Sequence, residues 1–208
     1  MTRFKSAWLP GALALIAALV GGVQLLQQGP AGPDLAITRG LQDIVGAGTG
    51  WAELLTQSAK APLLFGSIAL AAGLAALASG WRIALGVPLA YGFAWLADKA
   101  LRAIIYSPKP DAELVNVASA SSASGLPSTF ALVYGSLFGV ALLAPASRAA
   151  AMPVRFVAAL LILAGCAARV VLGGHWGSQM LASACLGLLF AWLAIVLVRR
   201  LAPGLSRD

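Results

Sequence analysis

The feature that most constrains this chain is a series of long windows with almost no charged residue. They cover residues 7–26, 60–82, 83–105, 126–144, 154–172 and 178–198. Roughly 20 apolar residues form one helical crossing of a bilayer. Only 10% of the chain is charged, against roughly 25% of a soluble domain. The windows therefore predict an all-α fold, a polytopic membrane bundle of about six transmembrane helices, with residues 1–208 forming a single domain.

The charged residues divide unequally between the two sides of the predicted bundle. One side, which holds both termini, carries one acid, Asp208, and the bases Arg3, Lys5, Arg82, Arg148, Arg155, Arg199, Arg200 and Arg207. The other side carries Asp34, Asp43, Glu53, Asp98, Asp111 and Glu113, together with Arg39, Lys60, Lys99, Arg102, Lys109 and Arg169. By the positive-inside rule the first side is cytoplasmic. We expect a multi-pass protein of the bacterial inner membrane with both termini in the cytoplasm.

The net charge of +7 does not indicate nucleic-acid binding, because the bases stand singly at window ends and form no patch with interleaved aromatic residues. Cys166 and Cys185 lie inside apolar windows, which is typical of small buried residues and not of a disulfide or a metal site. The first apolar window is longer than a signal-peptide core. A poor cleavage site follows it, so we expect this segment to be retained as a signal anchor.

Two segments on the outer side are long enough to form structure beyond the bilayer. Within residues 28–60, apolar residues recur at helical spacing on both sides of Gly-Ala-Gly-Thr-Gly, which predicts two short amphipathic helices lying on the membrane surface. Residues 107–125 include a run rich in serine and alanine that predicts an irregular loop.

Three cations, Arg102, Lys109 and Arg169, stand at outer helix ends near His175, the single histidine of the chain. Each has an ordinary explanation: Arg102 can pair with Asp98 one turn earlier, and a lysine or histidine can simply sit at the interface. Together, and with Lys99 as a less clear fourth member, they form a cluster suited to phosphate.

These residues fall into three spaced segments: Arg102-x6-Lys109-Pro110, then Pro127-Ser128-Thr129-Phe130, then Ala168-Arg169-x5-His175-x3-Gln179. The order and spacing resemble the type-2 phosphatidic acid phosphatase superfamily, which includes lipid phosphate and polyprenyl diphosphate phosphatases. Its signature is Lys-x6-Arg-Pro, Pro-Ser-Gly-His and Ser-Arg-x5-His-x3-Asp. The resemblance runs from the third predicted helix to the start of the sixth.

The resemblance implies a role for each matching position. Substrate phosphate would be held by Arg102, Lys109, Ser128, Thr129 and Arg169, and His175 would attack phosphorus to form a phosphohistidine, without a metal or another cofactor. The family's orienting aspartate is replaced by Gln179, which we expect to accept a hydrogen bond from the imidazole.

Other departures remove chemistry from the predicted site. Arginine and lysine are exchanged in the first segment, and Thr129 replaces a glycine where the backbone approaches phosphate. The histidine that protonates the leaving group is replaced by Phe130, which carries no proton. Asp111 and Glu113 could supply an acid, or they could be solvated loop residues.

Three functions are compatible with this pattern. The first is a phosphatase or phosphotransferase acting on a lipid phosphate, in particular a polyprenyl-type diphosphate, at the outer face of the membrane. The second is a catalytically impaired member that binds a lipid phosphate as a carrier, sensor or partner subunit. The third, a small transporter, lacks support because no predicted helix has a charged break in mid-membrane. The register of His175 with Arg169 favours the enzyme.

Overall fold

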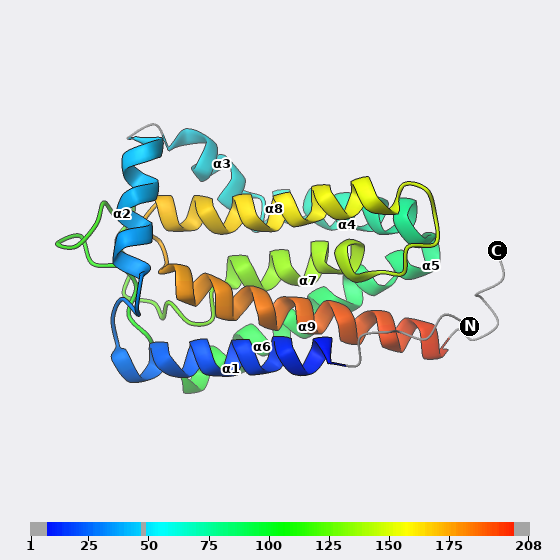
Figure 1. Ribbon diagram of the computed structural model, residues 1–208, viewed down its shortest axis with the longest axis horizontal. Coiled ribbons are helices and arrows are strands. Elements are labelled where there is room, and N and C mark those ends of the chain that lie inside the picture. The colour runs from blue at the N-terminus through cyan, green and yellow to red at the C-terminus, as the bar shows by residue number, and fades with distance from the viewer. Residues whose placement is uncertain (1–7, 47–48, 202–208) are drawn as a thin grey trace.

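The computed structural model describes residues 8–46 and 49–201, and every regular element in these ranges is a helix. In chain order they are α1 (Leu9–Gln27), α2 (Asp34–Val45), α3 (Gly50–Gln57), α4 (Leu63–Ser79), α5 (Trp81–Ala84), α6 (Gly86–Ile104), α7 (Thr129–Leu143), α8 (Ala151–Val171) and α9 (Gly177–Leu201). Six of them, α1, α4, α6, α7, α8 and α9, run side by side as a bundle (Figure 1). The predicted all-α bundle and its six long helices are therefore confirmed.

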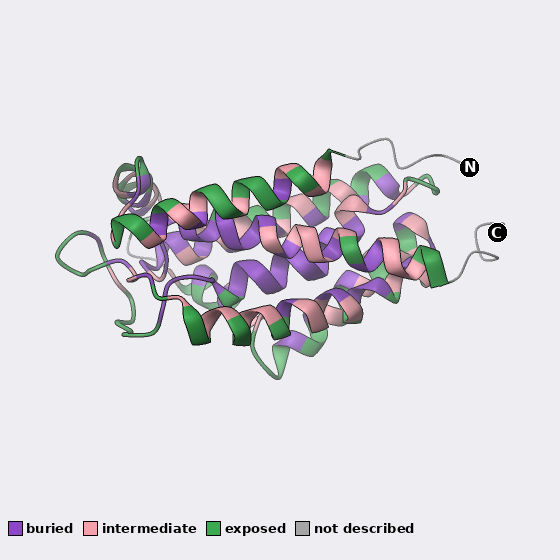
Figure 2. Ribbon diagram, turned by 90° about the horizontal axis from the view of Figure 1, so that it is seen from below, coloured by how far each residue is buried: buried purple, intermediate pink, exposed green. Residues whose placement is uncertain are grey.

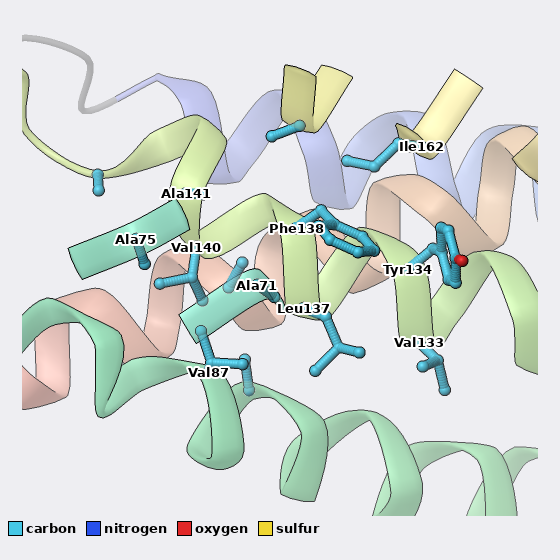
Figure 3. Packing of buried hydrophobic residues seen from close by; sticks show 14 of the residues in the cluster. Ala71, Ala75, Val87, Val133, Tyr134, Leu137, Phe138, Val140, Ala141 and Ile162 are labelled. Carbon is cyan, nitrogen blue, oxygen red and sulfur yellow. The ribbon is translucent and has the colours of Figure 1, made fainter. Parts of the chain in front are cut away.

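Helix α7 is the central element of the bundle. It packs against α4, α6, α8 and α9, and residues 130–141 are all buried (Figure 2). A helix that is apolar on every side is stable only when other helices surround it. Figure 3 shows its side chains Tyr134, Leu137 and Phe138 within the core.

Small residues bring α7 and α9 into close contact. A Cβ atom added to Gly135 would lie 2.7 Å from the Ala184 carbonyl oxygen, and one added to Gly187 would lie 2.5 Å from the Leu132 carbonyl oxygen. Both distances are too short for a side chain, so glycine is needed at each crossing point. Close approach over small residues is typical of helix pairs in membranes.

The outer surface of the bundle is apolar, as a lipid-facing surface must be. Exposed Leu19, Phe156 and Leu163 illustrate this on α1 and α8. In the described part of the chain, α1, α8 and α9 are long and apolar enough to span a membrane, and α4 and α7 are shorter apolar helices. The predicted membrane class is confirmed by this surface together with the fold.

The boundaries of the six long helices differ from the sequence prediction by one to three residues. The helix expected over residues 60–82 ends earlier, at Ser79, because Gly80 has φ of +96°, a conformation that glycine adopts without strain. The short α5 then leads into α6. The last helix extends three residues beyond the expected 198, to Leu201.

The two ends of the bundle differ in structure. Helix α2 lies across one end, with α3 and the irregular segment 105–128 beside it (Figure 1). Both short helices predicted between residues 28 and 60 are thus present. The first residue of α1 and the last of α9 lie toward the opposite end, as expected for an even number of crossings. The described acids belong to α2, α3, the second half of α6 and the 105–128 segment. Arg82, Arg148, Arg155, Arg199 and Arg200 belong to α5, the α7–α8 connection, the start of α8 and the end of α9.

Candidate active site

A cavity of about 270 Å³ opens at the end of the bundle where α2 lies. Its walls come from segments far apart in the chain: α3, the start of α4, the end of α6, the 105–128 segment, the start of α7, the end of α8 and the turn before α9. The lining residues are Thr56, Ala59, Lys60, Arg102, Lys109, Ala123, Thr129, Phe130, Arg169 and His175. Four of these carry positive charge and none carries negative charge, which makes the cavity suitable for an anion.

His175 lies in the turn between α8 and α9 and is buried. The turn requires Gly173, which has φ of +60° and whose added Cβ would lie 2.2 Å from the Asn116 carbonyl oxygen. His175 Nδ1 is 2.9 Å from the Gly125 carbonyl oxygen. A carbonyl oxygen only accepts, so Nδ1 carries the proton and Nε2 holds the free lone pair.

Burial lowers the pKa of His175 to about 3, and the positive charges of Arg169 and Lys109 act in the same direction. The imidazole is therefore neutral at physiological pH, as a nitrogen nucleophile must be.

Arg169, in the last turn of α8, forms no ion pair with any residue in the described ranges. Its guanidinium lies against Gly174, where an added Cβ would meet Nη2 at 2.8 Å. Its buried Nε has no hydrogen-bond partner among the described residues. A buried N–H group of this kind normally has a partner, so Arg169 is a candidate to bind an anion in the cavity.

Arg102, by contrast, directs most of its donors to the protein. Nε donates to Asp98 at 3.0 Å, Nη1 to the Ser124 carbonyl at 3.1 Å, and Nη2 to the Pro127 carbonyl at 2.7 Å and the Thr129 hydroxyl at 2.8 Å. Four of its five N–H groups are thus occupied. Pairing with Asp98, the ordinary explanation, is present, and Arg102 connects the end of α6 to the start of α7.

Lys109 lies in the 105–128 segment, where its Nζ donates to the Ser121 hydroxyl at 3.0 Å. Burial lowers the pKa of Lys109, and the neighbouring cations Arg169, Arg102 and Lys60 lower it further. Crowding of like charges around one ammonium group favours the arrival of an anion.

Lys60, which opens the α4 segment, also lines the cavity and was not expected there. In the sequence it is one more lysine at the edge of an apolar window, as is common at a membrane interface. No motif marks it, so only the folded chain brings it to the site.

The second motif segment lies at the start of α7, and its residues take different positions. Thr129 lines the cavity, where its hydroxyl accepts from Arg102 and donates to Asp98 at 2.8 Å. Ser128 is fully buried and is not part of the cavity lining; its backbone N–H donates to the Ser183 hydroxyl at 2.8 Å.

Phe130 forms part of the cavity wall. Its ring stacks on Tyr134 with centroids 4.2 Å apart, and an added Cβ on Gly165 would lie 2.5 Å from it. The ring therefore fills its place closely and offers the cavity an apolar surface.

The expected hydrogen bond between Gln179 and His175 is not formed, because both side chains have other partners. Gln179 Nε2 donates to the Pro108 carbonyl at 2.8 Å, to the Ser107 hydroxyl at 3.0 Å and to the Gln24 side-chain oxygen at 3.2 Å. Its Oε1 accepts from the Trp176 N–H at 3.2 Å. The Gly125 carbonyl takes the orienting role instead.

Gln179 nevertheless contacts the residue that supplies this carbonyl. A Cβ added to Gly125 would lie 2.5 Å from Gln179 Oε1, so the amide packs directly against the Gly125 backbone. The side chain thereby holds both ends of the 105–128 segment, at residues 107–108 and at Gly125, in place around His175.

The remaining candidates lie outside the cavity lining. Lys99 is exposed on α6, and Asp111 and Glu113 are exposed in the 105–128 segment, where the Asp111 carboxylate accepts from the Glu113 N–H at 3.0 Å. Both acids are solvated loop residues, which was one of the two alternatives. Cys166 and Cys185 are free thiols, as expected.

Comparison with known proteins identifies the family of the chain. The family model described as the PAP2 superfamily matches residues 84–203, more than half of the chain, so the chain belongs to that superfamily. The match starts just before α6 and includes every motif position discussed above. No curated protein sequence matches the chain significantly.

Among solved structures, the chain is similar to the first transmembrane PAP2 type phosphatidylglycerolphosphate phosphatase, from Bacillus subtilis. The TM-score is 0.71 at 20% sequence identity, over 96% of this chain and 98% of that chain. The chain therefore has a membrane PAP2-type phosphatase fold, as the three motif segments predict.

Proposed function

We propose that this protein is a membrane phosphatase that removes the terminal phosphate from a polyprenyl-type lipid diphosphate at the outer face of the bacterial inner membrane. The observation that carries the proposal is the state of His175. Its proton is on Nδ1, which leaves the Nε2 lone pair available beside two cations with free donors, Arg169 and Lys109.

The reaction proceeds in two displacement steps. Nε2 of His175 attacks the terminal phosphorus, an N–P bond forms, and the bridging P–O bond breaks to release the lipid monophosphate. Water then attacks the phosphohistidine, the N–P bond breaks, and inorganic phosphate leaves as the ring nitrogen regains its lone pair. Arg169 and Lys109 stabilise the charge on the equatorial oxygens throughout.

Phe130 supports a diphosphate over a phosphate monoester. It lines the cavity at the motif position of the family's proton donor, and its ring has no proton to give. An alkoxide is a poor leaving group without a proton, whereas a lipid monophosphate leaves as a stable anion. General acid catalysis contributes about 10²–10⁴-fold in rate, so its loss affects the monoester most.

The second candidate is a member that binds a lipid phosphate without turnover, as a carrier, sensor or partner subunit. The same Phe130 and the amide of Gln179, which cannot stabilise a developing positive charge, favour this alternative. The hydrogen bond that fixes the proton of His175 on Nδ1 favours the enzyme, since a protein that only binds phosphate needs no free lone pair on Nε2.

Phosphate release from a polyprenyl diphosphate and from phosphatidic acid tests the proposal, with purified protein in one detergent. Wild type should prefer the diphosphate. His175→Asn should abolish turnover of both substrates. Phe130→His should raise monoester turnover more than diphosphate turnover, because it restores a proton donor where the weaker leaving group needs it.

Equal rates on the two substrates in wild type would show that another group supplies the proton. Wild-type turnover in His175→Asn would reject the phosphohistidine mechanism. Lipid binding without release of phosphate from either substrate would favour the non-catalytic alternative.

A further inference from the structure

Lys60 is the one lining cation that the family motifs do not account for. Its backbone is fixed in the connection between α3 and α4: its N–H donates to the Gln57 carbonyl at 2.9 Å, and its carbonyl accepts from the Leu64 N–H at 2.8 Å. Its side chain is exposed on the α3–α4 wall of the cavity, together with Thr56 and Ala59. The side chain therefore starts from a fixed backbone position, lines the cavity and is open to a ligand.

The four lining cations come from different parts of the chain: Lys60 from the α3–α4 connection, Arg102 from α6, Lys109 from the 105–128 segment and Arg169 from α8. The charges of Arg169, Lys109 and Arg102 act on the imidazole, whereas that of Lys60 acts on Lys109. Lys60 is thus close enough to Lys109 for their two charges to interact, and it lines the same cavity as His175. Arg102 has four of its five donors committed within the protein.

A single phosphoryl group at His175 is matched by Arg169 and Lys109. An ionised phosphate carries a charge of about −1.5 to −2 near neutral pH, which two cations neutralise. Lys60, a third available cation in the cavity, has no role for a monophosphate. It does have one for a second ionised phosphate group on the same ligand.

We infer that Lys60, together with Lys109, forms a second phosphate subsite in this cavity. The subsite binds the lipid-attached phosphate of a lipid diphosphate. The terminal phosphate then lies at Arg169 and His175, and Lys109 bridges the two groups. Lys60 is a specificity-determining residue whose ammonium also stabilises the lipid monophosphate as it leaves. The inference rests on the proposed function. It adds a binding contact, between Lys60 and the second phosphate, to the preference for a diphosphate.

The test compares Lys60→Gln with Lys99→Gln, a matched removal of an exposed lysine outside the cavity lining. The measured quantity is kcat/KM for a polyprenyl diphosphate divided by kcat/KM for the polyprenyl monophosphate of the same chain length. Lys60→Gln should lower this ratio about tenfold, the lower range of a hydrogen bond between charged groups. Lys60→Arg should retain most of it, and Lys99→Gln should leave it unchanged.

A binding measurement tests the subsite without requiring turnover. The probes are the same lipid carrying a methylene-bridged diphosphonate or a single phosphonate, neither of which can be cleaved. Lys60→Gln should weaken the diphosphonate more than the phosphonate. An equal effect on both probes, or none, would overturn the subsite whether or not the protein is an enzyme. Selective loss of diphosphonate binding in a protein that releases no phosphate would retain the subsite and reject the catalytic proposal.

Discussion

At the scale of single residues, the direction of each hydrogen bond decides what a side chain can do for a ligand. Arg102 and Gln179 direct their donors into the protein and hold the segments around the cavity in place. Arg169, Lys109 and Lys60 keep donors for the cavity. The same residue types therefore take structural or binding roles according to the partners that the fold supplies.

Gln179 allows a sharp test of this division. Gln179→Asp restores the family's residue type, but a shorter, anionic side chain replaces an amide that donates to the Pro108 carbonyl, Ser107 and Gln24. We expect a loss of about 1–3 kcal/mol in unfolding free energy from unpaired acceptors, together with lower kcat. Thermal unfolding and phosphate release measure the two effects.

A matched control is Gln57→Asp, at an exposed glutamine near the end of α3. It should change neither quantity appreciably. Higher activity in Gln179→Asp would mean that the family's aspartate geometry forms here after all, with the Gly125 carbonyl displaced from Nδ1.

The sequence identified His175, Arg169 and Lys109 because their spacing matches a motif, and these residues do line one cavity. It could not identify Lys60 or the Gly125 carbonyl. A lysine at a window edge carries no distinguishing pattern, and a backbone carbonyl belongs to every residue. Both roles depend on how the 28–60 and 105–128 segments run over the end of the bundle. The spacing of apolar residues does not determine that path.

At the scale of elements, α2 is more than an amphipathic helix at an interface. Asp34, at its start, is buried and accepts from the Ser178 N–H at 2.8 Å, the Ala31 N–H at 2.9 Å and Gln24 at 3.1 Å. It caps the N-terminus of α9, where negative charge is favourable. Further along α2, Gln42 donates to the Asn116 carbonyl at 2.7 Å and the Val171 carbonyl at 2.9 Å.

Asp34→Asn keeps the size of the cap but removes its charge and one acceptor. We expect a loss of about 1–3 kcal/mol in unfolding free energy, because buried N–H groups at the start of α9 lose a charged partner. Thermal unfolding in detergent measures it. Asp43→Asn, an exposed acid on the same helix, is the matched control and should be neutral. Equal melting temperatures for both variants would remove the capping role from Asp34.

At the scale of the whole molecule, the six long helices were predictable because each is set by a continuous apolar window. Their order in space was not, because α7 becomes central only through the fit of Gly135 and Gly187 at its crossing with α9. The cavity forms where α6, α7, α8 and α9 meet at one end of the bundle. The segments 28–60 and 105–128, which lie between the apolar windows, cover that end.

Orientation in the membrane is testable with two exposed serines at opposite ends, Ser122 beside the site and Ser147 between α7 and α8. Ser122→Cys should react with a membrane-impermeant thiol reagent in intact cells. Ser147→Cys should react only after lysis, since the arginine-rich end is expected in the cytoplasm. Wild type, whose Cys166 and Cys185 lie within α8 and α9, is the background control. The reverse pattern would place the site inside the cell.

The absence of acids from the cavity lining has a consequence for the end of a reaction cycle. Inorganic phosphate, once formed, experiences the same attraction that drew the substrate in, and the cavity wall offers no negative charge to expel it. In a phosphatase built this way, product dissociation competes with chemistry as the slowest event. The affinity of the cavity for phosphate would then set an upper limit to kcat. Tighter binding of a scarce substrate would be accompanied by slower release of the product.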